Sequence, residues 1–336
     1  MNVRDVLPRD AIPSVDDPTF GPEYRGDPED RVLVLDADPP RAYPFRVLDF
    51  HEIVNDDLGR ERGESDSGSG DRGSDPVAVT WCPLCGSAVV YDRRLDDRTL
   101  TFGVSGKLAD DDLVLYDRET DSEWKQSTGE CIAGELAGER LSVRRAMTLT
   151  WAGFRERHPE GVVLQPPETE SEVASDDDTP APVDYDSDPY REYRAGEGFG
   201  LAAHRGEDDR RAWTVDDLAP KTVVLGLERE GEALAFPLPA VRAAGGVVRA
   251  TVGSTDAVVF EGDGELHAFA DPGIEFEPEG REGGDGAVRG DGTLWDPATG
   301  EAGDDRRLAR LPARRLYAFA WADDHGTDSF YAGEDG

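Results

Sequence analysis

Short segments in which apolar and polar residues alternate follow one another along most of this 336-residue chain. Alternation with a period of two is typical of strands with one buried face, and Gly, Asp and Asn mark the joints between the segments. The pattern predicts strands at residues 32–36, 77–81, 88–92, 99–104, 113–117, 222–226, 247–252 and 257–261. We therefore expect a mainly β protein (β-rich α+β) with few short helices.

One segment has the spacing of a helix instead. Trp151, Phe154 and His158 occupy positions i, i+3 and i+7, directly after Thr150 and before Pro159. Threonine is a preferred N-cap residue, and proline follows the ends of helices because it cannot continue them. The sequence thus predicts a helix that begins at Thr150 and ends before Pro159.

The chain also resembles itself. WKQSTGE at 124–130 and WDPATGE at 295–301 have the same spacing, and LSVRRAMTLTWA at 141–152 matches LPARRLYAFAWA at 311–322. Self-similarity over this length indicates two copies of one structural unit. We expect two fused pseudo-symmetric repeats of barrel or sandwich type. The predicted parts are an N-terminal extension (1–28), a first repeat (29–165), an acidic and Tyr-rich linker (166–214) and a second repeat (215–332).

The two copies differ in their reactive side chains. VTWCPLCGSAVVYDR at 79–93 contains Cys82 and Cys85, two of the three cysteines, whereas the second copy has TVGSTDAVVF at 251–260. HEIVND at 51–56 also has no counterpart in the second copy. Because the same scaffold exists without these groups, the comparison favours the first copy as the place of any chemistry.

Charge narrows the classes of partner. The chain has 73 acidic and 36 basic residues, which gives a formal net charge of -37. Such a surface repels nucleic acid and anionic membranes, and its self-repulsion is screened only at high salt, as in halophilic proteins. Two polar, acidic stretches, 59–75 and 166–182, predict segments without regular structure, the first of them a mobile hairpin insertion.

The sequence predicts a cytoplasmic location. It has no basic start followed by an apolar stretch, and no run of about 18 apolar residues. In a reducing compartment a close cysteine pair is more often metal-binding or redox-active than structural.

Several motifs together resemble a known family. LPRDAIPSVDDPTF, AYPFRVLDFHEIVND, VTWCPLCGSAVVYDR and YDSDPYREY, in this order, are similar to the bacterial and archaeal domain-of-unknown-function family 3179, over about residues 5 to 332. The family has no assigned reaction. Some members have selenocysteine in the Cys-x-x-Cys segment, so the resemblance implies redox use of this motif. The residues of this chain that match the family's motifs are His51, Glu52, Asn55, Asp56, Cys82, Cys85, Trp124, Gln126, Thr128 and Gly129.

Three hypotheses explain the Cys-x-x-Cys motif: a redox dithiol, a metal site and a structural turn. As a dithiol, Cys82 attacks, Cys85 resolves and His51 acts as the base. A strand on each side of Cys-Pro-Leu-Cys-Gly is instead typical of a metal knuckle, in which Gly86 adopts a positive φ angle. A closed zinc site needs four ligands and the chain lacks a second cysteine pair; we expect Cys131 to be a buried small residue.

The leading functional hypothesis is a thiol–disulfide redox protein that acts on an unknown protein or thiol substrate. The alternative is a metal-binding module in which Cys82, Cys85 and His51 hold a transition metal such as Zn, Cu or Fe, with one position open. A third hypothesis is a non-enzymatic interaction scaffold.

Other polar residues are assigned supporting roles. Alternation places His51 and Asn55 on one face of an extended segment, and Glu52 and Asp56 on the other. Trp124 recurs as Trp295 in the second copy and is therefore expected to anchor the core. Gln126 is not repeated, which makes it a candidate for lining a site. The predicted substrate or support residues are Glu52, Asn55, Asp56, Trp124 and Gln126.

Overall fold

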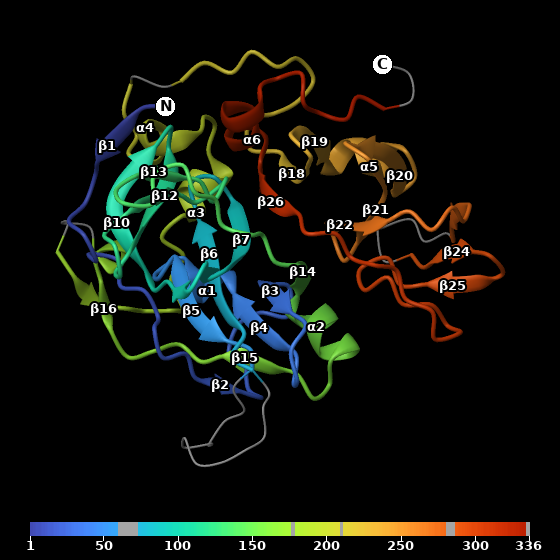
Figure 1. Cartoon of the computed structure of the whole chain (residues 1–336), viewed down its shortest axis with the longest axis horizontal. Coiled ribbons are helices and arrows are strands. Elements are labelled where there is room, and N and C mark those ends of the chain that lie inside the picture. Colours follow the sequence, from blue (N-terminus) through green and yellow to red (C-terminus); the bar gives the residue numbers. More distant parts are fainter. Residues whose placement is uncertain (60–72, 176–178, 209–210, 280–285, 334–336) are drawn as a thin grey trace.

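A six-stranded sheet in the order β19–β18–β26–β7–β6–β5 joins the two halves of the chain (Figure 1). The structure is a computed structural model that describes residues 1–59, 73–175, 179–208, 211–279 and 286–333. The strands of this sheet are β5 (Ile53–Asp57), β6 (Pro76–Cys82), β7 (Ser87–Asp92), β18 (Val223–Arg229), β19 (Glu232–Pro237) and β26 (Arg314–Tyr317). Because β26 pairs with β7 at Arg315 and Ala88, the two halves share one sheet.

Two further sheets cover the faces of the first half. One has the order β1–β10–β11–β12–β13 and the other β14–β3–β4–β15–β2. The first consists of β1 (Val3–Asp5), β10 (Phe102–Ala109), β11 (Asp112–Asp117), β12 (Glu123–Lys125) and β13 (Cys131–Ala133). The second consists of β2 (Phe20–Gly21), β3 (Arg31–Leu35), β4 (Arg41–Pro44), β14 (Met147–Thr150) and β15 (Val162–Leu164).

Every residue of β6 is buried because both faces of its sheet are covered. Ala78 and Cys82 lie in the core with residues of β10 and β11. Val79 and Trp81, whose side chains point to the opposite face, lie in the core with residues of β3 and β4. The alternation along β6 therefore places Cys82 on the face that the β10–β11 sheet covers.

The second half adds two small sheets, which lie at the right of Figure 1. Their strands are β20 (Val247–Val252), β21 (Thr255–Gly262) and β22 (Glu265–Ala270), and β23 (Phe276–Pro278), β24 (Val288–Gly290) and β25 (Thr293–Trp295). Two strand pairs complete the described β-structure: β8 (Arg94–Leu95) with β9 (Arg98–Thr99), and β16 (Glu170–Ser171) with β17 (Ala181–Pro182).

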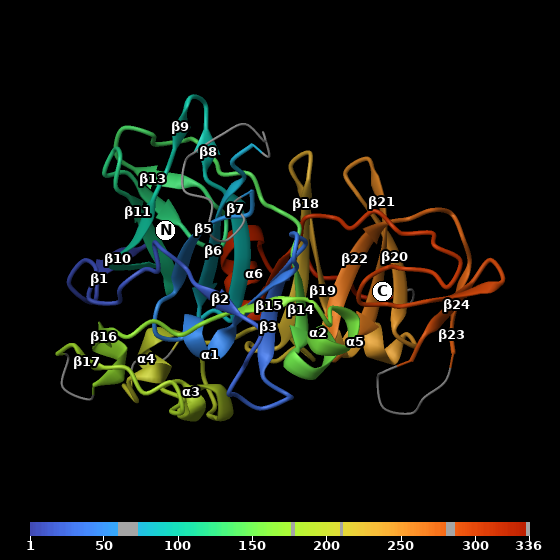
Figure 2. The same cartoon turned by 90° about the horizontal axis from the view of Figure 1, so that it is seen from below.

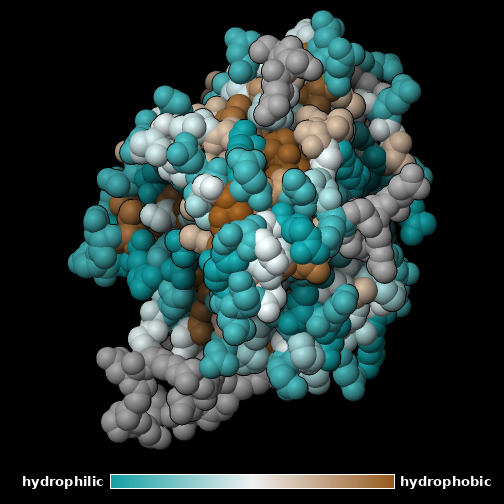
Figure 3. Space-filling view, turned by 90° about the vertical axis from the view of Figure 1, so that its right-hand side faces the viewer, coloured by the Kyte–Doolittle hydropathy of each residue, from teal (hydrophilic) through white to brown (hydrophobic). Residues whose placement is uncertain are grey.

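The helices of the described residues are short. They are α1 (Phe45–Leu48), α2 (Trp151–Arg157), α3 (Arg191–Ala195), α4 (Gly200–His204), α5 (Leu238–Ala243), α6 (Ala318–His325) and the 3-10 helix η1 (Glu172–Ala174). None of them is long and apolar enough to cross a membrane. On the face shown in Figure 3, hydrophilic side chains cover most of the surface, with smaller apolar areas between them.

The predicted fold class is confirmed: the protein is mainly β with short helices. The helix after Thr150 is also confirmed, since the Thr150 side chain accepts a hydrogen bond from the Gly153 amide at the start of α2. One strand prediction was wrong at its start. Thr99 pairs with Arg94 in the β8–β9 hairpin, and β10 begins only at Phe102.

The order of elements is alike in the two halves. Each half has two strands and a short helix near its start (β3–β4–α1 and β18–β19–α5), and each ends with a strand and a helix (β14–α2 and β26–α6). Trp124 and Trp295 are both fully buried, and Gly129 and Gly300 have φ angles of 71° and 72°. The similar order of elements in the two halves favours the predicted duplication. The duplication and the four predicted parts of the chain stay predictions.

The prediction of no regular structure can be checked for only one of the two acidic stretches. Most of the predicted hairpin insertion, residues 60–72, lies outside the described residues. The stretch at 166–182 contains β16, η1 and β17, so the expectation of no regular structure is wrong for these described residues. Residues 176–178 lie outside the described part.

Candidate functional site

The two cysteines flank the tight turn between β6 and β7. Cys82 ends β6 and pairs with Ser87, the first residue of β7. Gly86 in the turn has a φ of 55°, as predicted, and a Cβ there would lie 2.7 Å from the Tyr317 ring. The carbonyl of Cys85 accepts a hydrogen bond of 2.7 Å from the Tyr317 amide. The turn therefore requires glycine and is held in place by β26 of the second half.

Three buried side chains meet beside this turn. The sulfurs of Cys82 and Cys85 and a carboxylate oxygen of Asp112 all lie within 4.8 Å of one another. Asp112 begins β11, directly after Asp110 and Asp111, which both have positive φ angles. Cys85 donates a hydrogen bond of 3.3 Å to the Asp111 carbonyl. The structure thus places the carboxylate of Asp112 beside the cysteine pair. The sequence pattern did not indicate this residue.

One oxygen of Asp112 is unsatisfied. Its Oδ2 accepts a hydrogen bond of 2.8 Å from the Ser127 amide, whereas its buried Oδ1 has no partner among the described residues. Burial raises the pKa of Asp112 to about 6, although the nearby Lys125 opposes this rise. An unpaired buried carboxylate oxygen is costly unless something binds to it.

Helix α6 of the second half holds the residues around Asp112. Asp324 accepts a hydrogen bond of 2.6 Å from the Ser127 hydroxyl and forms an ion pair with Lys125. Figure 2 shows α6 beside the six-stranded sheet, where it packs against β18, β19 and β26. The end of the chain therefore fixes the loop that supplies the Ser127 amide to Asp112.

The local charge disfavours a free thiolate at Cys85. Burial raises the pKa of the Cys85 thiol well above its ordinary value, and Cys82, Asp112 and Asp111 raise it further. A neighbouring cation would lower this pKa, as in reactive thiols. The cluster is thus a buried, electron-rich group of sulfur and oxygen atoms.

A cavity of about 340 Å³ reaches this cluster. Cys82, Glu52 and Tyr190 line it, whereas Cys85 and Asp112 lie behind Cys82 and are not among its lining residues. Glu52 is buried, and its Oε2 has no hydrogen-bond partner in the part of the chain that the structure describes. Burial raises the pKa of Glu52 to about 8, with smaller contributions from Asp49, Asp112 and Glu172.

The predicted linker packs directly on the cysteine turn. The Tyr193 hydroxyl donates a hydrogen bond of 2.6 Å to the Leu84 carbonyl and accepts one of 3.1 Å from the Gly200 amide. Tyr190 lies beside it and contributes to the wall of the cavity. The segment with α3 and α4 therefore closes one side of the site.

His51 is not brought into the cluster. One ring nitrogen is 2.8 Å from the Pro13 carbonyl and the other is 2.7 Å from the Tyr185 hydroxyl. His51 is not a lining residue of the cavity, and it does not belong to the group formed by Cys82, Cys85 and Asp112. With both nitrogens engaged, His51 connects β5 to the surrounding loops, and its predicted catalytic or metal role stays a prediction that this geometry does not favour.

The other residues of HEIVND have separate positions. Asn55 donates 2.7 and 2.8 Å hydrogen bonds to Asp16 and to the Phe102 carbonyl, and accepts one from the Phe102 amide. Asp56 is buried in an ion pair of 2.7 Å with Arg41. Both residues hold β5 against its neighbours. Of this motif, the structure brings Glu52 alone to the cavity with Cys82.

The remaining predicted residues lie in the core. Trp124 is fully buried and donates a hydrogen bond of 2.9 Å to Asp117. Gln126 donates one of 2.8 Å to the Thr80 hydroxyl, and thereby connects the loop after β12 to β6. Cys131 is buried, as expected, and its thiol donates to the Ala133 carbonyl rather than joining the cysteine pair.

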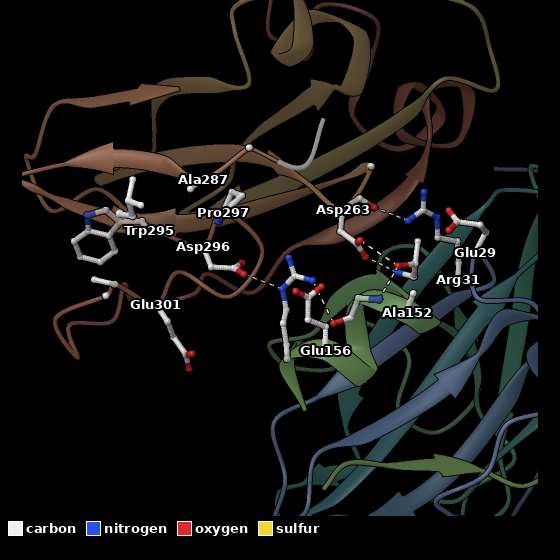
Figure 4. A pocket seen from close by; sticks show the side chains of 18 residues that line it. Glu29, Arg31, Ala152, Glu156, Asp263, Ala287, Trp295, Asp296, Pro297 and Glu301 are labelled. Carbon is white, nitrogen blue, oxygen red and sulfur yellow. Dashed lines mark hydrogen bonds and ion pairs between the residues drawn. The ribbon is translucent and has the colours of Figure 1, made fainter. Parts of the chain in front are cut away.

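A larger cavity of about 760 Å³ lies between α2 and the second half (Figure 4). Its charged groups largely satisfy one another. Arg157 pairs with Asp296 at 2.9 Å, and Asp263 accepts hydrogen bonds from the amide and hydroxyl of Thr150. These contacts connect the two halves, and we do not assign a ligand to this cavity.

Comparison with known proteins identifies the family. A model of the family described as "Protein of unknown function (DUF3179)" matches residues 9–328, nearly the whole chain. The chain belongs to this family. No curated protein and no solved structure matches it. Since membership in DUF3179 assigns no reaction, the function of this DUF3179 protein has to be inferred from its site.

Proposed function

We propose that this protein binds a transition-metal ion such as Zn²⁺ through Cys82, Cys85 and Asp112. The observation that carries the proposal is the meeting of these three buried ligand atoms within 4.8 Å, with Asp112 Oδ1 unpartnered among the described residues. Ligands at about 2.0–2.3 Å from a tetrahedral zinc ion lie about 3.3–3.8 Å apart.

The electrostatics of the cluster support a cation. Burial raises the pKa of Cys85, Cys82, Asp112 and Asp111 raise it further, and Asp112 itself is buried with one oxygen unsatisfied. A divalent ion stabilises two thiolates and a carboxylate together, and so removes the cost of burying them. The same surroundings disfavour a thiolate at Cys85, which is the resolving thiol of the dithiol mechanism.

Three protein ligands leave one position for water or substrate, which is the arrangement of catalytic zinc sites. The cavity reaches the cluster at Cys82, so a fourth ligand has a route of entry. A metal there acts as a Lewis acid on an oxygen atom. Glu52, in the same cavity and with a pKa of about 8, supplies a carboxyl group that exchanges protons near neutral pH.

The test is the metal content of protein purified without oxygen in high salt. We expect about one zinc, copper or iron ion per chain, since structural and catalytic sites retain their metal through purification. Cys82→Ser should reduce this to near zero, whereas Cys131→Ser, which removes a buried cysteine outside the cluster, should leave it unchanged. Metal-free wild-type protein that also fails to take up added zinc would disprove the proposal.

A redox dithiol is the second candidate, and one observation favours it. Cys82 lines the cavity while Cys85 is fully buried behind it, which suits an attacking and a resolving thiol. Cys82 thiolate would attack a substrate disulfide and release one thiol; Cys85 would then displace the second, so that two electrons pass to the substrate. A reversible Cys82–Cys85 disulfide in metal-free protein would favour this candidate over the metal site.

A further inference from the structure

We infer that the cavity beside Cys82 binds a small molecule with an apolar chain and one neutral, oxygen-bearing head group, such as a carbonyl compound. The inference rests on the proposed metal centre, because the head group would occupy the open position of that centre. It goes further by naming the chemical class of the ligand, which the metal cluster alone does not determine.

The walls of the cavity are predominantly apolar. Leu7 and Ile12 come from the N-terminal segment, Leu108 from β10, Leu113 from β11 and Leu201 from α4. A chain with a net charge of -37 has little reason to line a cavity of about 340 Å³ with leucine and isoleucine unless an apolar group occupies it. The walls therefore indicate an aliphatic part of the ligand.

Polar groups are concentrated near the cysteine cluster. Glu52 Oε2 is buried and has no hydrogen-bond partner within the described residues, and Tyr190 lines the cavity together with Glu52. Tyr190 shares the lining of the cavity with Cys82, so a ligand bound there lies within reach of a hydroxyl donor. One oxygen atom bound at this point would accept a hydrogen bond from Tyr190 and satisfy a buried group.

The charges around the cavity select a neutral head group. Glu172 lines the cavity and Asp112 belongs to the adjoining cluster, so an anionic head group would be repelled, whereas Glu52, with a pKa of about 8, is mostly uncharged at neutral pH. Two cations also line the cavity: Lys107 is paired with Glu123 at 2.6 Å, and Arg205 is exposed, so that solvent screens its charge. An aldehyde, ketone, ester or amide fits these charges better than a carboxylate or a phosphate does.

The test uses cobalt-loaded protein and a series of n-alkyl amides, which stay neutral when they bind a metal through the carbonyl oxygen. The cobalt absorption spectrum reports both the loading of the metal and the binding of the probe. We expect the Kd to fall roughly threefold per added methylene from acetamide to hexanamide, because each methylene leaves water for the leucine-lined wall. Tyr190→Phe should weaken every member of the series about equally.

Two leucines give a matched pair of variants. Leu7 and Leu218 are both half-buried at the edge of the same core, but only Leu7 lines the cavity. Leu7→Gln should reduce the dependence on chain length and keep the cobalt spectrum, whereas Leu218→Gln should change neither. Cobalt binding with no dependence on chain length would overturn the inference and leave the metal centre intact. Failure of the protein to bind cobalt at all would overturn both.

Discussion

At the scale of single residues, the surroundings of the cysteines contain several buried oxygen atoms without partners. Within the described residues these are Glu52 Oε2, Ser87 Oγ, Asp112 Oδ1 and Gln126 Oε1. Each such atom costs about 1–3 kcal/mol when nothing binds to it. Ser87 pairs with Cys82, and Gln126 is hydrogen-bonded to the Ser87 carbonyl, so the atoms surround one turn. A bound metal and ligand would offset part of this cost.

His267 gives a residue-scale prediction for the second half. It is fully buried, with its Nε2 3.0 Å from the Gly262 carbonyl, and burial lowers its pKa to about 3. Below pH 6.5 the unfolded chain binds a proton that folded His267 refuses, so stability falls as pH falls from 6.5 toward 3. When the pH is lowered from 7 to 4.5, the free energy of unfolding of His267→Gln should fall by about 2 kcal/mol less than that of wild type.

Urea unfolding in constant high salt at each pH measures this difference. His204 provides the comparison: burial lowers its pKa too, but less than that of His267, so His204→Gln should change the pH dependence less than His267→Gln does. Parallel pH profiles for wild type and His267→Gln would show that His267 is not buried in its neutral form.

The site could be predicted only in part from the sequence. Cys82 and Cys85 were recognised because their spacing is itself a chemical signal. Asp112 was not, since it is one of three successive aspartates, and only the packing of the β10–β11 sheet over β6 places it at the cysteines. His51 was chosen for its residue type, yet the positions of Pro13 and Tyr185, which satisfy both of its nitrogens, depend on tertiary structure.

At the scale of elements, the β6–β7 hairpin determines where the two sulfurs lie. Its turn needs a positive φ at Gly86 and has no room for a Cβ against Tyr317. Gly86→Ala should therefore lose about 2–4 kcal/mol of stability, from the left-handed backbone and the clash together. Gly206 is the control, because its φ is 69° and a Cβ added there would have nothing within 4 Å.

Denaturant unfolding of both variants separates the two costs. Gly206→Ala should lose only about 1 kcal/mol, the cost of the backbone conformation alone. Equal losses in the two variants would mean that Tyr317 does not pack against the turn as described.

Most elements could be predicted because their periodicity is local. β20 matches its prediction residue for residue, and β6, β7 and β11 extend theirs by only a residue or two. The start of β10 could not be predicted, because Thr99 has the composition of a strand residue and pairs instead with Arg94. Which strands share a sheet was also beyond the sequence, since the pairing of β26 with β7 connects residues far apart in the chain.

At the scale of the whole molecule, the second half completes the site of the first. Tyr317 of β26 holds the cysteine turn, and Asp324 of α6 holds Lys125 and Ser127 beside Asp112. The second half has no cysteines of its own. Its role in the proposed function is therefore to position the loops of the first half, which explains how a half without thiols contributes to the site.

Net charge leads to a prediction for the whole molecule. A formal charge of -37 makes the folded chain repel itself, and salt screens this repulsion as the Debye length shortens to about 3 Å near 1 M. The thermal unfolding midpoint should rise steadily between about 0.2 and 3 M KCl, well beyond the rise produced by sucrose at equal osmolality. A midpoint independent of KCl would contradict this view of the surface.

The most direct test of the metal centre is the X-ray absorption spectrum of zinc-loaded protein at the zinc edge. The account predicts two sulfur neighbours at about 2.3 Å and oxygen neighbours at about 2.0 Å, from Cys82, Cys85, Asp112 and one further ligand. The oxygen from Asp112 should be lost in Asp112→Asn. A shell that contains imidazole nitrogen, four sulfurs or no sulfur would contradict the site.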